Sequence, residues 1–188
     1  MTRQKTKAEL AGDAAAQWWR DLHPDPDRNH KGDRAALARL RRMGSVPEAL
    51  TDPAVMCLIR KIAGATGWRL SPEDRRVSAA AIAGVTLAHL RKSGKPPMAE
   101  VLGQKSEKDA PPRYSGLRFT RLIRAESDDE RLTQLGRAAR RLRADDAPVN
   151  IARLAADLFR LWSDDTDAVR RDWTFQYHQM TASAPGAE

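Results

Sequence analysis

Residues 71–91 have the sequence SPEDRRVSAAAIAGVTLAHLR, and this stretch indicates which kind of fold the chain adopts. Its first four residues, SPED, combine a cap, a proline and acidic side chains, a combination that begins helices. The residues that follow are mostly apolar or small, and the alanines of 79–83 together with Gly84 allow other helices to approach closely. The stretch therefore predicts a long helix over about 71–91 that packs against several neighbours.

The rest of the chain shows the same helical periodicity. Apolar residues recur at intervals of three and four, and alternating β-branched patterns are nearly absent. The predicted fold class is therefore all-α, with two small helical bundles and about eight or nine helices. The expected helical segments cover about 11–22, 33–43, 52–67, 71–91, 98–102, 117–124, 127–142, 148–162 and 164–180.

Breaks in this pattern predict the domain organisation. Residues 1–102 are expected to form an N-terminal helical bundle and residues 113–180 a C-terminal one. The stretch 94–112 holds four prolines and two glycines, and its second part, 103–112, is the predicted linker. Residues 181–188 are expected to form a frayed tail.

Several classes of protein are disfavoured by the motifs that are missing. The single cysteine, Cys57, rules out an intramolecular disulfide and a Cys-rich zinc module. The four histidines lack the HxxxH and HExxH spacings, so no metal site is predicted. No GxGxxG, GxxxxGK[ST] or GxSxG motif occurs, so we expect no catalytic residue, no cofactor and no small-molecule substrate. The longest mostly apolar run, 78–90, is too short for a membrane span, which predicts a cytoplasmic protein with no membrane partner.

The charge balance points towards an anionic partner. The chain has 33 basic and 25 acidic residues, a net charge of +8, and 25 of the basic residues are arginine. The planar guanidinium group suits phosphate, although codon bias or surface ion pairing also produces arginine-rich chains. Residues 113–143 hold nine basic and four acidic residues, whereas residues 144–188 hold four and eight. A basic middle segment therefore precedes an acidic C-terminal segment.

The placement of the arginines is more informative than their number. Arg118, Arg121 and Arg124 are spaced by three, on the side of their helix away from the apolar residues. Two further groups of closely spaced arginines lie in segments 34–42 and 137–143. Their like charges repel one another unless an anion lies nearby. Such residues can instead offset a helix dipole or pair with Glu130 and Asp145. The surplus favours a surface that follows nucleic-acid phosphates. The candidate nucleic-acid contacts are Arg34, Arg39, Arg41, Arg42, Arg118, Arg121, Arg124, Arg137, Arg140, Arg141 and Arg143.

The tryptophans divide into two groups. Trp18, Trp162 and Trp173 lie on apolar stripes and are expected in the core. Trp19 and Trp68 are the two that we consider for stacking on a nucleic-acid base.

Three segments and three aromatic residues carry a resemblance to a known family. They are GDRAALARLRR (32–42), RFTRLIRA (118–125), VNIARLAADL (149–158), Trp162, Trp173 and Tyr177. In order and spacing, from about residue 18 to residue 177, they resemble the CasB family, the small subunit of the type I-E CRISPR surveillance complex Cascade. The loop 103–112 is longer than expected for that family and the C-terminal segment more acidic, which leaves open which basic residues face DNA.

The resemblance implies a non-catalytic accessory subunit of an RNA-guided antiviral complex that binds DNA. Its implied partners are the guide RNA, the target and displaced DNA strands, the other Cascade subunits and a second copy of itself, arranged head to tail. It would stabilise the guide RNA and both DNA strands in the R-loop, while base pairing with the guide supplies sequence recognition. The alternative is an independent α-helical DNA-binding regulator, with Arg75, Arg76 and Ser78 on a recognition helix.

Overall fold

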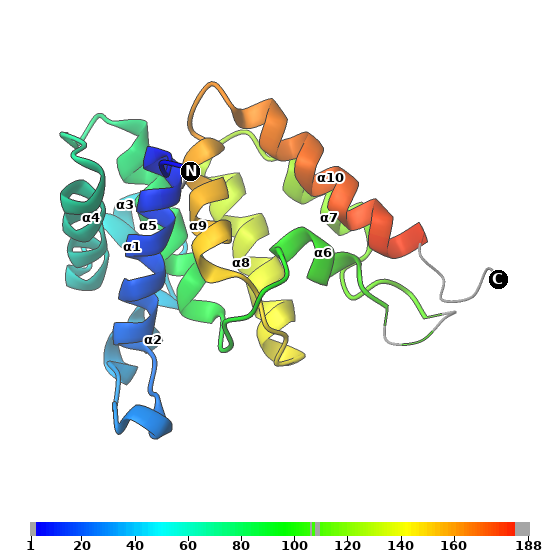
Figure 1. Ribbon diagram of the computed structural model, residues 1–188, viewed down its shortest axis with the longest axis horizontal. Helices are drawn as coiled ribbons and strands as arrows, with labels where there is room; N and C mark the ends of the chain where they lie inside the picture. Colours follow the sequence, from blue (N-terminus) through cyan, green and yellow to red (C-terminus); the bar gives the residue numbers. More distant parts are fainter. Residues whose placement is uncertain (1–2, 106, 108–109, 183–188) are drawn as a thin grey trace.

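The computed structural model describes residues 3–105, 107 and 110–182, and within these residues the fold is entirely helical (Figure 1). The elements are α1 (Lys7–Leu22), the 3-10 helix η1 (Pro26–Arg28), α2 (Arg34–Leu40), α3 (Val46–Leu50), α4 (Pro53–Thr66), α5 (Arg75–His89), α6 (Met98–Gly103), α7 (Gly116–Arg124), α8 (Asp128–Ala144), α9 (Ile151–Arg160) and α10 (Thr166–Ala182). The all-α prediction is confirmed. The described residues contain ten α-helices, more than the predicted eight or nine, because α3 is too short for periodicity to reveal it.

Local capping explains where several helices begin. The carboxylates of Asp33 and Asp52 accept hydrogen bonds from backbone N–H groups at the starts of α2 and α4, and Ser127 forms a capping box at the start of α8. The start predicted at Ser71 is too early. Asp74 caps α5 instead, its carboxylate accepting from the N–H of Arg76 at 2.9 Å, so the helix begins at Arg75.

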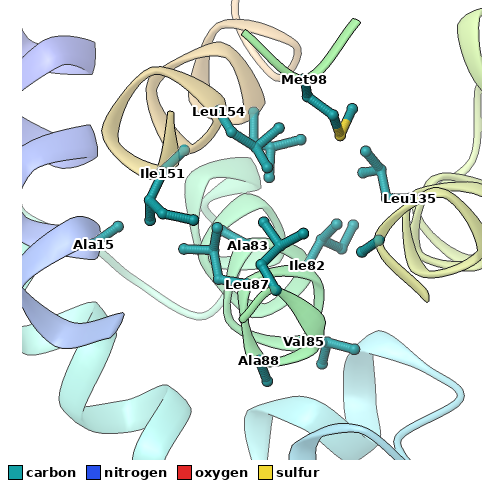
Figure 2. Close-up of a cluster of buried hydrophobic side chains, with 14 of the residues drawn as sticks. Ala15, Ile82, Ala83, Val85, Leu87, Ala88, Met98, Leu135, Ile151 and Leu154 are labelled. Carbon is teal, nitrogen blue, oxygen red and sulfur yellow. The ribbon is translucent and has the colours of Figure 1, made fainter. Parts of the chain in front are cut away.

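Helix α5 forms the centre of the molecule. Its residues are buried without interruption from Ala79 to His89, and it packs against α1, α2, α3, α4, α8 and α9. Figure 2 shows Ile82, Ala83 and Leu87 of this helix meeting side chains from α1, α6, α8 and α9. The many alanines of α5 let these neighbours approach on every side, as predicted for residues 79–84.

Helices from the two predicted bundles also contact each other directly. Helix α1 packs along α9, and α6 packs against α10. One continuous cluster of buried apolar residues runs through both segments. The division into two bundles stays a prediction. Helix α10 extends to Ala182, and positions 106, 108–109 and 183–188 of the predicted linker and tail lie outside the described residues.

The contact between α1 and α9 depends on Gly12. A Cβ atom on this residue would lie 2.3 Å from the backbone oxygen of Ala152 on α9, a distance that atoms do not tolerate. Gly64, on α4, has no heavy atom within 4 Å of the corresponding position. The two glycines are therefore a matched pair, since both are helical and only one is required by packing.

We predict opposite effects of alanine at these two positions. Gly12→Ala should destabilise the protein by about 1–3 kcal/mol because α1 and α9 must move apart. Gly64→Ala should stabilise it by about 0.5–1 kcal/mol because alanine loses less backbone entropy in a helix. Urea unfolding of the two variants measures both effects. Equal shifts of the same sign would contradict the α1–α9 packing.

Candidate nucleic-acid interface

Two hollows in the surface collect eight of the eleven predicted arginines. The first, which we name the α7–α8 hollow, is lined by Tyr114, Arg118, Arg121, Gln134, Arg137, Arg140 and Arg141. The second, the α2–α8 hollow, is lined by six cations, Arg20, Arg34, Arg41, Arg91, Lys92 and Arg143, by two carboxylates, Asp25 and Asp27, and by residues that include Trp19 and His23. Helix α8 thus contributes arginines to both.

Packing of the apolar faces of α7 and α8 turns their arginines outward. Phe119 and Leu122 bury one side of α7, and Leu135 and Leu142 bury one side of α8. The arginines of the α7–α8 hollow occupy the opposite sides and are exposed. This placement agrees with the orientation predicted from the spacing of Arg118 and Arg121.

Four of the five arginines in the α7–α8 hollow lack a carboxylate partner within the part of the chain that the structure describes. They are Arg118, Arg121, Arg137 and Arg140. The fifth, Arg141, donates from Nε to the backbone oxygen of Arg113 at 3.0 Å and lies 3.4 Å from the Asp145 carboxylate. Of the two acidic partners considered from the sequence, only Asp145 forms a pair. Glu130 instead accepts hydrogen bonds from the N–H groups of Glu126 and Ser127.

Cations also crowd one another in the α2–α8 hollow. Arg41 is half-buried and donates from Nε to the backbone oxygen of Ala88, 2.7 Å away. Burial, together with the charges of Arg143 and Arg91, lowers the pKa of Arg41. Neither Arg91 nor Lys92 was among the sequence candidates. The sequence feature that could have identified them is that they form a basic pair just after the C-terminus of α5, a position that favours cations.

Arginines of both hollows act on one buried residue, His89. This side chain is buried, and the pKa of His89 is lowered to about 4, first by burial and then by the charges of Arg140, Arg41 and Arg143. Arg140 lines one hollow, whereas Arg41 and Arg143 line the other. A neutral imidazole therefore lies under a run of positive charge that spans both hollows.

A second buried histidine repeats this arrangement. His23 hydrogen-bonds through Nδ1 to the backbone oxygen of Trp19 at 2.9 Å, so Nδ1 carries a proton. The pKa of His23 is lowered to about 4, mainly by burial, with the charges of Arg41 and Arg143 acting in the same direction. Both histidines are thus neutral core residues beneath the basic surface.

Three predicted arginines lie outside the hollows. Arg39 pairs with Asp52 at 2.8 Å, and this buried carboxylate raises the pKa of Arg39. Arg42, just beyond the end of α2, donates from Nε to the backbone oxygen of Ala38 on that helix. Arg124 is exposed at the end of α7. At Arg39 the surface ion pairing considered from the sequence is realised.

The tryptophans mostly occupy the core. Trp18, Trp162 and Trp173 are buried, as predicted. Trp19 is also buried and stacks on the His23 ring at 4.4 Å, so the suggestion that it stacks on a base is wrong. The Trp68 ring is half-buried and already carries the Arg76 guanidinium at 4.8 Å. Of the two tryptophans considered for stacking on a base, only Trp68 therefore keeps part of its ring exposed.

Other kinds of site find no support in the described ranges. No group of three or more His, Cys, Asp or Glu side chains within them could hold a metal ion. None of the helices in this part of the chain is long and apolar enough to cross a bilayer.

The described residues thus define an all-helical protein with unpaired arginines gathered around α8. The family model of CRISPR-associated protein Cse2 matches residues 36–178, and the chain therefore belongs to the CRISPR-associated Cse2 family. This confirms the resemblance to CasB and makes the protein a subunit of the CRISPR Cascade complex, with the other Cascade components as partners.

Comparison with solved structures agrees on the fold. The chain matches the crystal structure of CasB from Thermobifida fusca with a TM-score of 0.70 and 20% sequence identity. The match covers 90% of this chain and 98% of that one. A search of curated proteins finds no match. Members of the Cse2 family are structural subunits of Cascade.

The buried histidines predict a loss of stability in acid. Both have a pKa of about 4 in the folded state, below the value of about 6.5 expected when unfolded. Their contribution is therefore complete above pH about 6.5 and is lost as the pH falls towards 4, on the order of 3 kcal/mol per histidine. Urea unfolding at pH values of about 7.5, 6 and 5 measures the loss.

Two further measurements make this prediction specific. Titration of the imidazole signals by NMR should show that His23 and His89 remain neutral at pH about 5. The variant His89→Gln should show a smaller loss of stability between pH 7.5 and 5. A free energy of unfolding that does not change over this range would contradict the prediction.

Proposed function

We propose that this Cascade subunit holds nucleic-acid strands by their phosphate backbones and performs no chemical step itself. The observation that carries the proposal is the α7–α8 hollow, where four arginines lie together without a carboxylate partner among the described residues. Such crowding is unfavourable in the free protein, and a phosphate backbone relieves it while releasing counterions. The α2–α8 hollow supplies further arginines, and two of them act on the same buried His89 as Arg140 does.

The strands that we propose are the guide RNA, the target strand and the displaced strand of the R-loop. Base pairing with the guide supplies the sequence recognition, so the subunit needs only to hold backbones. Exposed guanidinium groups suit this task because they bind phosphate oxygens whatever the base. Membership of the Cse2 family supports this assignment, since it makes the chain a subunit of Cascade.

The structure gives the alternative regulator no recognition helix. Helix α5, on which Arg75, Arg76 and Ser78 lie, is enclosed by its neighbours over most of its length. Arg76 is also held by Asp74 and by the ring of Trp68. A helix that enters the major groove needs a free face, and α5 has none from Ala79 to His89.

We further propose that the subunit pairs head to tail with a second copy of itself and acts in the cytoplasm with the other Cascade components. The resemblance of residues 18–177 to the CasB family supports this pairing. Sedimentation of the reconstituted complex, with the mass assigned to this subunit, measures the copy number. A single copy would contradict the pairing.

The isolated protein should bind single strands without sequence preference and with a strong dependence on salt. If about six phosphates are contacted, the slope of log K against log salt is about −4, and a fourfold rise in salt costs about two to three decades of affinity. Fluorescence anisotropy with strands of unrelated sequence at two salt concentrations tests this. Binding that ignores salt, or that favours one sequence strongly, would contradict the proposal.

Replacing the four unpaired arginines of the α7–α8 hollow with alanine should weaken binding but not folding. The variant Arg118→Ala, Arg121→Ala, Arg137→Ala, Arg140→Ala should flatten the salt slope by about 3, because about four phosphate contacts are lost. Its melting temperature should change little, since exposed positions away from the core usually contribute within about 0.5 kcal/mol each.

A control variant removes the same charge from elsewhere. Arg60, Arg69, Arg75 and Arg171 are exposed and line neither hollow, so replacing all four with alanine should leave most of the affinity. In a reconstituted complex the hollow variant should shorten the R-loop lifetime more than the control does. If both variants lost the same affinity and the same R-loop lifetime, net charge alone would explain binding, and the hollow would have no specific role.

A further inference from the structure

We propose that the base of the α7–α8 hollow is a discrete site for one phosphate group of a bound strand, in which the Tyr114 hydroxyl donates a hydrogen bond to a phosphate oxygen. Arg118, Arg137 and Arg140 supply the positive charge around it. This inference rests on the proposed function, because it names how one part of the basic surface holds the backbone.

The first observation is an unsatisfied hydroxyl group. Tyr114 is 2% exposed, it lines the hollow, and its hydroxyl has no hydrogen-bond partner among the described residues. Buried hydroxyl groups are nearly always hydrogen-bonded, so an exception calls for a reason. A phosphate oxygen would accept the proton that the phenol has to donate.

The second observation is the chemistry of the surrounding side chains. The charges of Arg118, Arg137 and Arg140 act on the Tyr114 hydroxyl, and no carboxylate lines the hollow. The groups around the hydroxyl are therefore mainly donors, which leaves a place for an anion with several acceptor oxygens. Burial outweighs these charges and raises the pKa of Tyr114, so the phenol keeps its proton at neutral pH.

The third observation is that the backbone of Tyr114 is held on both sides. Its N–H donates to the oxygen of Leu102 on α6 at 3.0 Å, and its carbonyl oxygen accepts from the Tyr177 hydroxyl on α10 at 2.6 Å. The Tyr177 ring in turn stacks on Phe119 of α7, with 3.9 Å between the ring centroids. The backbone of Tyr114 is thus fixed by α6 and α10, so its side chain starts from a defined position, as a binding site requires.

Of the chemical groups that a strand presents, the backbone phosphate fits these donors best. The bases offer no charge, and the backbone presents one phosphate per nucleotide with oxygens that accept from several directions. Guanidinium groups can approach such a group from the open side of the hollow while the phenol donates from below. The site differs from a flat basic surface because one of its donors is uncharged and fixed.

The test is Tyr114→Phe, which removes the hydroxyl and retains the ring. Because this hydroxyl is buried without a partner in the free protein, the variant should fold with a melting temperature that is equal to or higher than that of the parent protein. Its affinity for a single-stranded oligonucleotide should fall about tenfold, the usual effect of losing a hydrogen bond to a charged group. The salt slope should stay the same, since no charge is lost.

Thr86→Val is the matched control. Thr86 also has a buried hydroxyl without a partner, but it lies on α5 and lines neither hollow. This variant should bind strands like the parent protein. A similar loss in both variants would overturn the proposal, because the effect would then come from the core rather than from the hollow.

Two further probes identify the source of the phosphate. A methylphosphonate strand, whose phosphorus groups are uncharged but keep one acceptor oxygen, should bind both proteins weakly, and the difference between the parent protein and Tyr114→Phe should be smaller than with the normal strand. Inorganic phosphate should compete with the normal strand only at high concentration. If Tyr114→Phe no longer bound inorganic phosphate but kept its full affinity for the strand, the ligand of the site would be a free anion. That result would overturn the proposal.

The outcomes also separate this inference from the proposed function. If the four-arginine variant loses strand binding while Tyr114→Phe does not, the backbone-holding function stands and the discrete site is wrong. If the parent protein does not bind strands at all, the proposed function fails first, and the phosphate site of a strand fails with it.

Discussion

The burial of α5 is the constraint on which the rest of the structure depends. A helix enclosed on all sides must be narrow, and its alanines and Gly84 provide that narrowness. Helices from both ends of the chain can therefore pack on it, and α1 and α9 come into close contact beside it. Lengthening these small side chains would separate the surrounding helices and open the single apolar cluster.

The end of this central helix also connects the core to the charged surface. The last carbonyl groups of a helix have no partner within it, and the C-terminal end attracts cations. Arg41 uses this property by donating to the carbonyl oxygen of Ala88. His89, the last residue of α5, stays neutral beneath Arg41, Arg140 and Arg143. A protonated imidazole there would add one more charge to a region already crowded with positive charges.

The unpaired arginines are the feature that the fold itself does not explain. Some cations elsewhere are paired with carboxylates, as Arg39 is with Asp52 and Arg160 with three aspartates. In the α7–α8 hollow the fold brings like charges together and offers no carboxylate. Local rules of this kind are usually broken where a protein binds something, and the phosphate backbone is the ligand that we propose. Under the proposed function, strands of any sequence would be bound in this way, and the guide alone would choose among them.

The sequence by itself determined the helical class, most helix positions and the outward direction of Arg118 and Arg121. These properties are local, since caps act over three residues and an amphipathic face repeats every three or four. Only the tertiary structure decided which arginines are free, because the partners come from distant segments: Asp52 lies 13 residues after Arg39, and Ala88 lies 47 residues after Arg41. Tyr114 could not be singled out either. Its backbone is held by Leu102 and by Tyr177, 63 residues further along, and no local pattern encodes such a contact.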